Sequence, residues 1–307
     1  MALYRRMAVI GCGLIGSSFL RAAKAAGAAD HYVAHDRSVE VRERVRALGL
    51  VDTVTDTAQE AVKDCDLVVL ATAPAAIGAV AGQIASALAP GATVTDVGSA
   101  KQAVSDAFGA VLPDTVFPIP GHPIAGTEQS GPDAGFAELF NERWAILCPV
   151  SRKDAPYLAA VDRLSRLWES FGSQVELMDA HHHDLVLAVT SHLPHLIAYN
   201  IVGTAADLEE VTESEVMKFS AGGFRDFTRI AASDPVMWRD VFILNKDAVL
   251  EVLGRFTEDL QALSRAIRWG EADKLEALFT RTRAIRKGIV AAGQDAPEPN
   301  FGRNRKG

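Results

Sequence analysis

The sequence is poor in cysteine and has no excess of positive charge, and both shortages exclude classes of protein. Its 307 residues include three cysteines, which are too few and too scattered for a disulfide framework or a zinc cage: Cys12, Cys65 and Cys148. The formal net charge is −8 and no basic stripe offsets it, so nucleic acid is not an expected partner. We therefore expect a protein of a reducing compartment, the cytoplasm.

Long uninterrupted hydrophobic runs are also missing. Residues 67–95 carry no charge, but Pro74 and Gly82 are among the residues that interrupt them, and the segment fits strand, loop, short helix and strand. Residues 7–20 superficially resemble an export signal, yet Arg21 follows where a cleavage site would be expected. We expect neither segment to enter a membrane.

The first part of the chain alternates short apolar runs with helical patterns, which is typical of a parallel sheet covered on both faces. The expected strands are Met7–Ile10, His31–His35, Leu67–Ala71, Thr93–Asp96, Val116–Pro118, Ala145–Pro149 and Gln174–Met178. The expected helices are Ile15–Ala26, Val39–Leu48, Lys101–Val111 and Ala155–Phe171. These elements predict an α/β fold, a Rossmann-type dinucleotide-binding domain over residues 1–178.

After Asp179 the strand signals end and helical patterns follow, roughly over 180–206, 209–219, 235–269 and 271–292. The sequence thus predicts an all-helical domain over residues 179–293, suited to a dimer interface. Residues 294–307 have no periodicity and are rich in Pro, Asn, Gly and basic residues, so we expect a disordered tail.

A glycine-rich motif, Gly11-Cys12-Gly13-Leu14-Ile15-Gly16, follows the first strand and opens a helix. Gly11 would permit the tight turn, Gly13 the approach of a pyrophosphate, and Gly16 close packing of helix and strand. The N–H groups of the helix start, including those of Leu14 and Ile15, would face the phosphates.

An acidic residue ends the second strand, 20 residues beyond the motif: Asp36. A carboxylate there accepts hydrogen bonds from ribose hydroxyls, which favours NAD over NADP. Arg37 beside it could still tolerate a 2′-phosphate, so NADP stays possible.

A histidine lies among glycine and proline in the segment Gly121–Glu128. The ring of His122 can take up a proton near neutral pH, as hydride chemistry at an alcohol carbon requires. Because Gly and Pro surround it, we expect His122 on a tight loop.

Ser99 follows the strand that ends at Asp96, where ligands of open parallel sheets bind. Its hydroxyl could bridge a substrate oxygen and His122, or it could cap the following helix, and both roles could coexist. Lys101 fits a solvated helix residue or a phosphate neighbour better than a catalytic amine.

Five of the eight histidines lie between residues 181 and 195. No carboxylate has a spacing typical of zinc ligands, and a helix-kinking proline separates His192 from His195, so we expect no metal site. Asp184 and His195 would share a helix face that could line the cleft. For His181, His182 and His183 we favour a solvated helix start.

Arg225 and Arg229 are four residues apart, which places them on one helical face. An arginine at a cleft is a natural partner for a substrate carboxylate, because its planar fork binds both oxygens. Trp238 fits a core position as well as a site position.

Taken together, these segments resemble the prephenate/arogenate (cyclohexadienyl) dehydrogenases of tyrosine biosynthesis. The resemblance runs from Val9 to about Leu260 and rests on five motifs in order: Gly11–Ser17, Asp96–Lys101, Gly121–Glu128, Ser191–His195 and Asp226–Asp240. It implies a homodimer that uses NAD(P) to decarboxylate prephenate to 4-hydroxyphenylpyruvate, arogenate to tyrosine, or both.

The resemblance also implies roles for single residues. His122 would take the proton of the ring hydroxyl, Ser99 would orient it, and His195 would position substrate and cofactor. Arg229 would bind a carboxylate, and Glu128 and Asp184 would belong to an ionic network that gates the cleft. Further substrate contacts are expected from Ser191, His192, Thr127, Gly222 and Trp238.

Two alternatives stay open at this point. Another dehydrogenase with a Rossmann and a helical domain, of the 3-hydroxyacid type, would normally need a helix-borne lysine as acid and base, and the region of His192 and His195 offers none. A regulator that binds NAD without turnover would not need His122, Ser99 and Arg229 together.

Overall fold

The computed structural model describes residues 2–127, 129–209 and 222–291. The chain divides into two compact units, Met1–Leu250 and Glu251–Gly307. The candidate site lies entirely in the first unit. Glu128, most of the helix expected over 209–219, and the expected tail lie outside the described residues.

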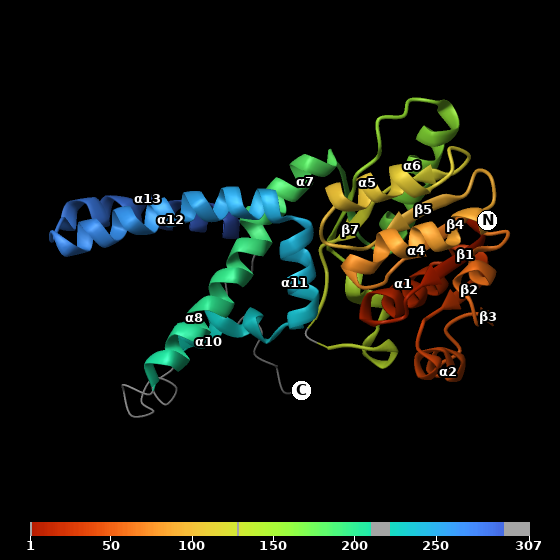
Figure 1. Ribbon diagram of the computed structural model, residues 1–307, viewed down its shortest axis with the longest axis horizontal. Coiled ribbons are helices and arrows are strands. Elements are labelled where there is room, and N and C mark those ends of the chain that lie inside the picture. Colours follow the sequence, from red (N-terminus) through yellow and green to blue (C-terminus); the bar gives the residue numbers. More distant parts are fainter. Residues whose placement is uncertain (1, 128, 210–221, 292–307) are drawn as a thin grey trace. The chain divides into compact units, whose positions relative to one another are not determined.

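The first unit is built around a parallel sheet with strand order β3-β2-β1-β4-β5-β6 (Figure 1). The order reverses between β1 and β4, which leaves a crevice at the carboxyl ends of the strands. This confirms the predicted Rossmann-type fold. The strands are β1 (Tyr4–Ile10), β2 (Ala29–His35), β3 (Thr53–Val54), β4 (Leu67–Leu70), β5 (Thr93–Asp96) and β6 (Phe117–Pro118).

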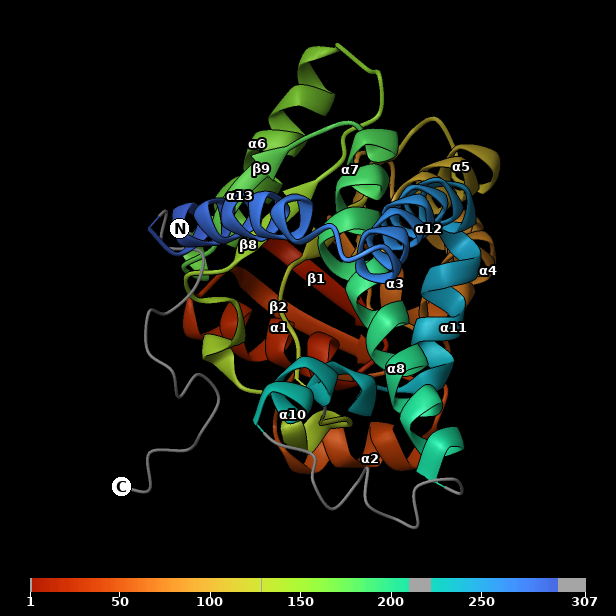
Figure 2. The same ribbon diagram turned by 90° about the vertical axis from the view of Figure 1, so that its left-hand side faces the viewer.

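Alternate residues of the buried strands point to opposite faces and form two separate cores. In β1, Met7 and Val9 belong to one core with helices α1 (Leu14–Ala25) and α6 (Ala155–Ser170). Ala8 and Ile10 belong to the other core, with α3 (Ala58–Val62), α4 (Ile77–Ile84) and α5 (Gln102–Val111). Helix α2 (Val39–Ala47) follows β2, and Figure 2 shows β1, β2 and α1 from another side. Short 3-10 turns at Pro74–Ala76 and Ala85–Ala87 flank α4.

A second sheet of three strands carries the His122 segment, in the order β7-β8-β9. It consists of β7 (Gly121–Pro123), β8 (Trp144–Leu147) and β9 (Gln174–Leu177), with β7 antiparallel to β8. Two predictions are therefore wrong: His122 lies on a strand rather than a loop, and the strand after Ala145 is not part of the parallel sheet. Pairing with β8 imposes the strand, which local sequence does not indicate. The link from β7 to β8 contains 3-10 turns at Pro132–Ala134 and Ala137–Phe140.

The helices after residue 179 begin with α7 (Ala180–Leu187), which continues through a π-helical turn at Ala188–His192 into α8 (Leu193–Glu209). Pro194 has no N–H and its ring clashes with the carbonyl four residues earlier, which explains the wide turn. Helix α10 (Gly222–Thr228), a 3-10 turn at Arg229–Ala232 and α11 (Pro235–Leu244) follow. The single helix predicted over 235–269 is two helices, because Asn245 separates α11 from α12 (Lys246–Arg268).

Residues 180–208 form a helical stretch long and apolar enough to cross a membrane by length and composition alone. A core helix of a soluble protein passes the same test. This stretch contains His183, Asp184 and His192, all buried in the first unit. The domain border expected at residue 178 stays a prediction, because helices on both sides of it belong to the first compact unit.

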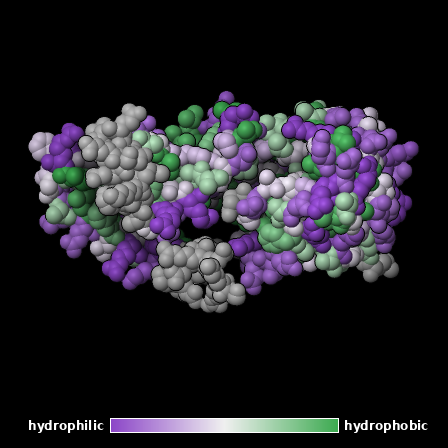
Figure 3. Space-filling view, turned by 90° about the horizontal axis from the view of Figure 1, so that it is seen from below, coloured by the Kyte–Doolittle hydropathy of each residue, from purple (hydrophilic) through white to green (hydrophobic). Residues whose placement is uncertain are grey.

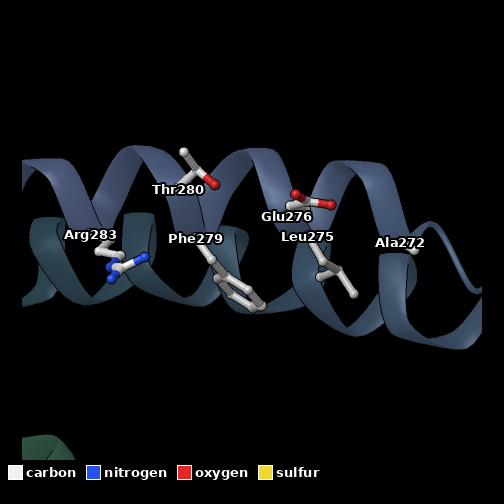
Figure 4. A pocket seen from close by; sticks show the side chains of 6 residues that line it. All are labelled: Ala272, Leu275, Glu276, Phe279, Thr280 and Arg283. Carbon is white, nitrogen blue, oxygen red and sulfur yellow. The ribbon is translucent and has the colours of Figure 1, made fainter.

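The second unit contains most of α12 and all of α13 (Ala272–Ala291), joined by a turn at Gly270 with φ +66°. Its surface carries large apolar side chains, among them Trp269, 73% exposed, and Phe279, 57% exposed. Hydrophobic residues are interspersed with hydrophilic ones on the hairpin that α12 and α13 form (Figure 3). Figure 4 shows an open groove along α13, lined by Ala272, Leu275, Glu276, Phe279, Thr280 and Arg283.

Candidate active site

The glycine motif has the geometry that a bound dinucleotide requires. Gly11 has φ +94°, and a Cβ there would lie 2.5 Å from the carbonyl oxygen of Ala71. A Cβ on Gly16 would lie 2.0 Å from the carbonyl oxygen of Gly11, so both positions require glycine. A Cβ on Gly13 would meet no atom of a described residue within 4 Å. No described side chain caps α1 at Gly13, which leaves its first N–H groups open to an anion.

Asp36 lies directly beside this motif, at the end of β2. Its carboxylate accepts hydrogen bonds from the backbone N–H of Cys12 at 2.8 Å and of Ser38 at 2.9 Å. These bonds fix the carboxylate at the crevice and leave lone pairs for further donors. Arg37 is exposed. The residues present therefore fit a dinucleotide with an unmodified ribose.

A buried ion pair positions the strand that carries His122. Lys101 is fully buried, and its Nζ lies 2.5 Å from Oδ2 of Asp96 and 2.7 Å from the carbonyl oxygen of Gly121. Oδ1 of Asp96 accepts from the N–H of Gly121 at 3.0 Å. The expectation of a solvated Lys101 is wrong, because this ammonium joins the end of β5 to the start of β7.

His122 belongs to a chain of hydrogen bonds that ends on a carboxylate. Its Nδ1 lies 2.9 Å from Nε2 of His183, and Nδ1 of His183 lies 2.8 Å from Oδ1 of Asp184. Asp184 also accepts from the backbone N–H groups of Lys101 at 2.7 Å and Gln102 at 2.9 Å. The solvated helix start expected for His183 is wrong, since its side chain is fully buried.

Burial controls the protonation of this chain. Burial lowers the pKa of His122 well below its usual range, and His183, Lys101 and His192 lower it further. Burial also lowers the pKa of His183, although its hydrogen bond to Asp184 acts in the opposite direction. Burial opposes ionisation of Asp184, yet hydrogen bonds from His183 and two backbone N–H groups hold its pKa below the usual value. At neutral pH both imidazoles are therefore neutral and the carboxylate is ionised.

A second group of side chains gathers around Trp238 on α11. The ring of His195 stacks on Trp238 with centroids 3.6 Å apart, and its Nδ1 lies 2.8 Å from the carbonyl oxygen of Ser191. His192 is fully buried, and burial lowers its pKa to about 4. Its Nδ1 lies 3.1 Å from the side-chain amide of Asn245.

Two buried nitrogens in this group have no hydrogen-bond partner among the described residues: Nε2 of His192 and Nε1 of Trp238. The Asn245 amide nitrogen can only donate, so Nδ1 of His192 accepts and its Nε2 carries the hydrogen. Both orphan atoms are consequently donors. Buried donors without partners are costly, and a ligand oxygen would satisfy them.

The other predicted site residues lie as follows. Ser99 is half-buried, and its hydroxyl has no hydrogen bond to a described residue. It does not cap α5, which begins at Gln102 and whose first N–H donates to Asp184. Arg229 is exposed. Burial lowers the pKa of His195, and the charge of Arg229 lowers it further. Thr127 is exposed, and Gly222 opens α10.

The orienting role implied for Ser99 and the gating role implied for Asp184 stay predictions, and the described contacts add two further partners. His183, not Ser99, is bonded to His122. Asp184 is buried and accepts hydrogen bonds from the backbone at the start of α5. Asn245 was not predicted, although it also donates to the carbonyl of Asp184 at 2.8 Å. In the sequence, Asn245 stands out only as a polar amide residue inside an apolar helical pattern.

The parallel sheet, the glycine turn and a buried imidazole with one nitrogen unbonded among the described residues define a dehydrogenase that uses a nicotinamide dinucleotide. Comparisons with known proteins narrow this class. The family model described as "Prephenate dehydrogenase, nucleotide-binding domain" matches residues 19–177, and "Prephenate dehydrogenase, dimerization domain" matches residues 179–281. The chain belongs to the prephenate dehydrogenase family.

Individual relatives agree with this assignment. A cyclohexadienyl dehydrogenase of Zymomonas mobilis is 43% identical over 93% of this chain and 96% of its own length. A prephenate dehydrogenase of Bacillus subtilis is 32% identical over 91% of this chain and 74% of its own length.

Solved structures of similar proteins give the same result. The prephenate dehydrogenase of Aquifex aeolicus in complex with hydroxyphenyl propionate and NAD+ superposes with a TM-score of 0.85, at 32% identity, over 93% of this chain and 98% of that one. The arogenate dehydrogenase of Synechocystis superposes with a TM-score of 0.79, at 25% identity, over 92% and 99%.

Proposed function

We propose that the chain catalyses the oxidative decarboxylation of prephenate to 4-hydroxyphenylpyruvate, of arogenate to tyrosine, or of both, in the cytoplasm. The cofactor is NAD, and when bound it would supply the acceptor for the hydride released from the ring carbon that bears the hydroxyl. The observation that carries the proposal is His122, whose Nδ1 is bonded to His183 while Nε2 has no described partner.

Nε2 of His122 would take the hydroxyl proton as the ring is oxidised. Its lowered pKa keeps the imidazole unprotonated at neutral pH, so the base is ready before substrate arrives. Loss of carbon dioxide then makes the ring aromatic. Ser99, whose hydroxyl has no described hydrogen-bond partner, follows β5 and is suited to contact the same substrate oxygen.

The anionic substrate would be held by the groups around Trp238. Nε2–H of His192 and Nε1–H of Trp238 supply two buried donors for its oxygens. Arg229, exposed on the same unit, offers a fork for a carboxylate. Ser191, Thr127, Gly222 and His195 remain proposed substrate contacts, and Glu128 a proposed gate.

The dinucleotide would be held by Gly11, Gly13, Leu14, Ile15 and Gly16 at the start of α1 and by Asp36 at the ribose. We propose a preference for NAD over NADP, because the fixed carboxylate of Asp36 would repel a 2′-phosphate. Exposed Arg37 is the group that would reduce this preference.

The test is an assay of reduced-cofactor formation with each of the two acids and each of the two cofactors. We expect turnover with at least one acid and a higher kcat/KM with NAD than with NADP. Absence of turnover in all four combinations would refute the proposal. The same matrix determines whether the enzyme distinguishes the keto from the amino side chain.

We also propose that two copies associate through the helical part of the chain. The family's second domain is described as a dimerization domain, and it matches residues 179–281. The exposed apolar side chains of α13, such as Phe279, are suited to such an interface.

A further inference from the structure

The chain of hydrogen bonds behind His122 has a fixed direction. A carboxylate accepts hydrogen bonds and donates none, so Nδ1 of His183 must donate to Asp184. A neutral imidazole carries one hydrogen, which leaves Nε2 of His183 as an acceptor. Nδ1 of His122 must then carry a hydrogen to bond with it. By the same count, Nε2 of His122 holds the lone pair.

We propose that the Asp184–His183 pair locks His122 in the tautomer that presents an unprotonated Nε2 to the substrate, which makes His183 a positioning residue for proton transfer. The proposal deepens the proposed function and rests on it wherever turnover is measured. An unconstrained histidine would divide between two tautomers, and only one of them places the lone pair at Nε2.

Several contacts hold the pair in this arrangement. Asp184 is fixed by the two backbone N–H groups at the start of α5, and its own carbonyl accepts from Asn245. These bonds prevent the carboxylate from turning away from His183. The rings of His122 and His183 meet edge to face with centroids 5.1 Å apart. The tautomer is therefore set by packing that exists before any ligand binds.

The pair also affects the charge that forms during the reaction. When Nε2 takes the hydroxyl proton, His122 becomes an imidazolium that keeps its Nδ1–H bond to His183. The carboxylate of Asp184 stabilises this cation through His183, with no need for a second proton transfer. The other groups facing the two rings are Lys101 and His192, which oppose positive charge, and Asp96, which is paired with Lys101.

Replacement of His183 separates positioning from packing. His183→Phe keeps a ring in the buried space but removes both nitrogens. We expect kcat to fall about 10- to 1,000-fold, with KM little changed and the acid limb of the pH–kcat profile displaced. His183→Gln, whose amide oxygen can still accept from Nδ1 of His122, should recover part of this loss. The matched control is His182→Phe on the exposed neighbour, which should keep the wild-type profile.

Nitrogen NMR of the wild-type protein with labelled histidine tests the tautomer without substrate or turnover. The His122 signals are those missing from His122→Asn. We expect them to show a protonated Nδ1 and an unprotonated Nε2 near neutral pH. The opposite tautomer, or a full kcat in a folded His183→Phe, would overturn the proposal. If His183→Phe does not fold, the tautomer seen in the wild-type spectrum alone tests the proposal. If the wild-type enzyme has no turnover, the proposed function is refuted, but the tautomer measured by NMR still stands.

Discussion

At the residue scale, the site uses four neutral histidines in two different tautomers: His122, His183, His192 and His195. His122 and His195 donate through Nδ1, to His183 and to the carbonyl of Ser191, which leaves an acceptor at each Nε2. His192 accepts at Nδ1 from Asn245 and therefore donates at Nε2. The hydrogen-bond partner of Nδ1 in each ring therefore determines whether Nε2 acts as an acceptor or as a donor.

Arg229 provides a test of carboxylate binding at this scale. Arg229→Ala should raise KM for the acid by about 10- to 100-fold, because a charged hydrogen bond contributes about 1.5–3 kcal/mol. Its effect on kcat should be smaller. Arg225→Ala, also exposed and one helical turn earlier, is the matched control and should leave KM near the wild-type value. Equal effects of the two changes in steady-state kinetics would contradict the assignment.

The buried histidines also predict how stability depends on pH. The pKa of His192 falls from 6.5 in the unfolded chain to about 4 in the folded one, so the unfolded chain binds more protons between these values. The contribution of His192 to the free energy of unfolding is fully present above about pH 6.5. It is lost as the pH falls toward 4, by about 1.4 kcal/mol per pH unit for each such group. His122 and His183, whose pKa values are also lowered, act in the same direction.

Urea unfolding at a series of pH values measures this effect. The free energy of unfolding should decline through the window, and His192→Gln should make the decline shallower. A free energy that is constant between pH 6.5 and 4 would show that these histidines are not buried in their neutral form.

At the element scale, the turn from β1 to α1 has two glycines that serve packing and one that faces open space. Gly16→Ala should destabilise the protein by about 1–3 kcal/mol or more, because its Cβ would overlap the Gly11 carbonyl. Gly13→Ala, with space for a methyl group, should fold nearly normally yet raise KM for NAD. Thermal unfolding together with cofactor titration checks both. A normal KM for NAD in Gly13→Ala would place the pyrophosphate elsewhere.

Much of the first domain could be predicted from sequence, because its strands and helices have strong local periodicity. Strands such as Thr93–Asp96 agree with the structure residue for residue. The strand β7 could not be predicted, since pairing with β8 creates it. The hydrogen bond between His122 and His183 could not be predicted either, because the two residues are 61 positions apart in the chain. The place of His183 at a helix start indicates a solvent-exposed side chain.

At the scale of the whole molecule, the proposed dimer accounts for the exposed apolar side chains of the second unit. Phe279→Glu should convert the dimer to a monomer at micromolar concentration, because it places a charge in an apolar contact. Arg281→Glu introduces the same side chain two residues along α13, on the opposite face of the helix, and should leave the dimer intact. Light scattering distinguishes the two outcomes. A dimeric Phe279→Glu would exclude this face as the interface.

The whole account depends on proton transfer to one nitrogen, and His122→Asn tests it most directly. Asparagine cannot act as a base, and the substitution removes little side-chain volume. With the preferred acid and NAD, we expect kcat to fall about 10²- to 10⁴-fold while the dissociation constants of both ligands stay close to wild type. A variant that turns over at the wild-type rate would contradict the assignment of His122 as the base.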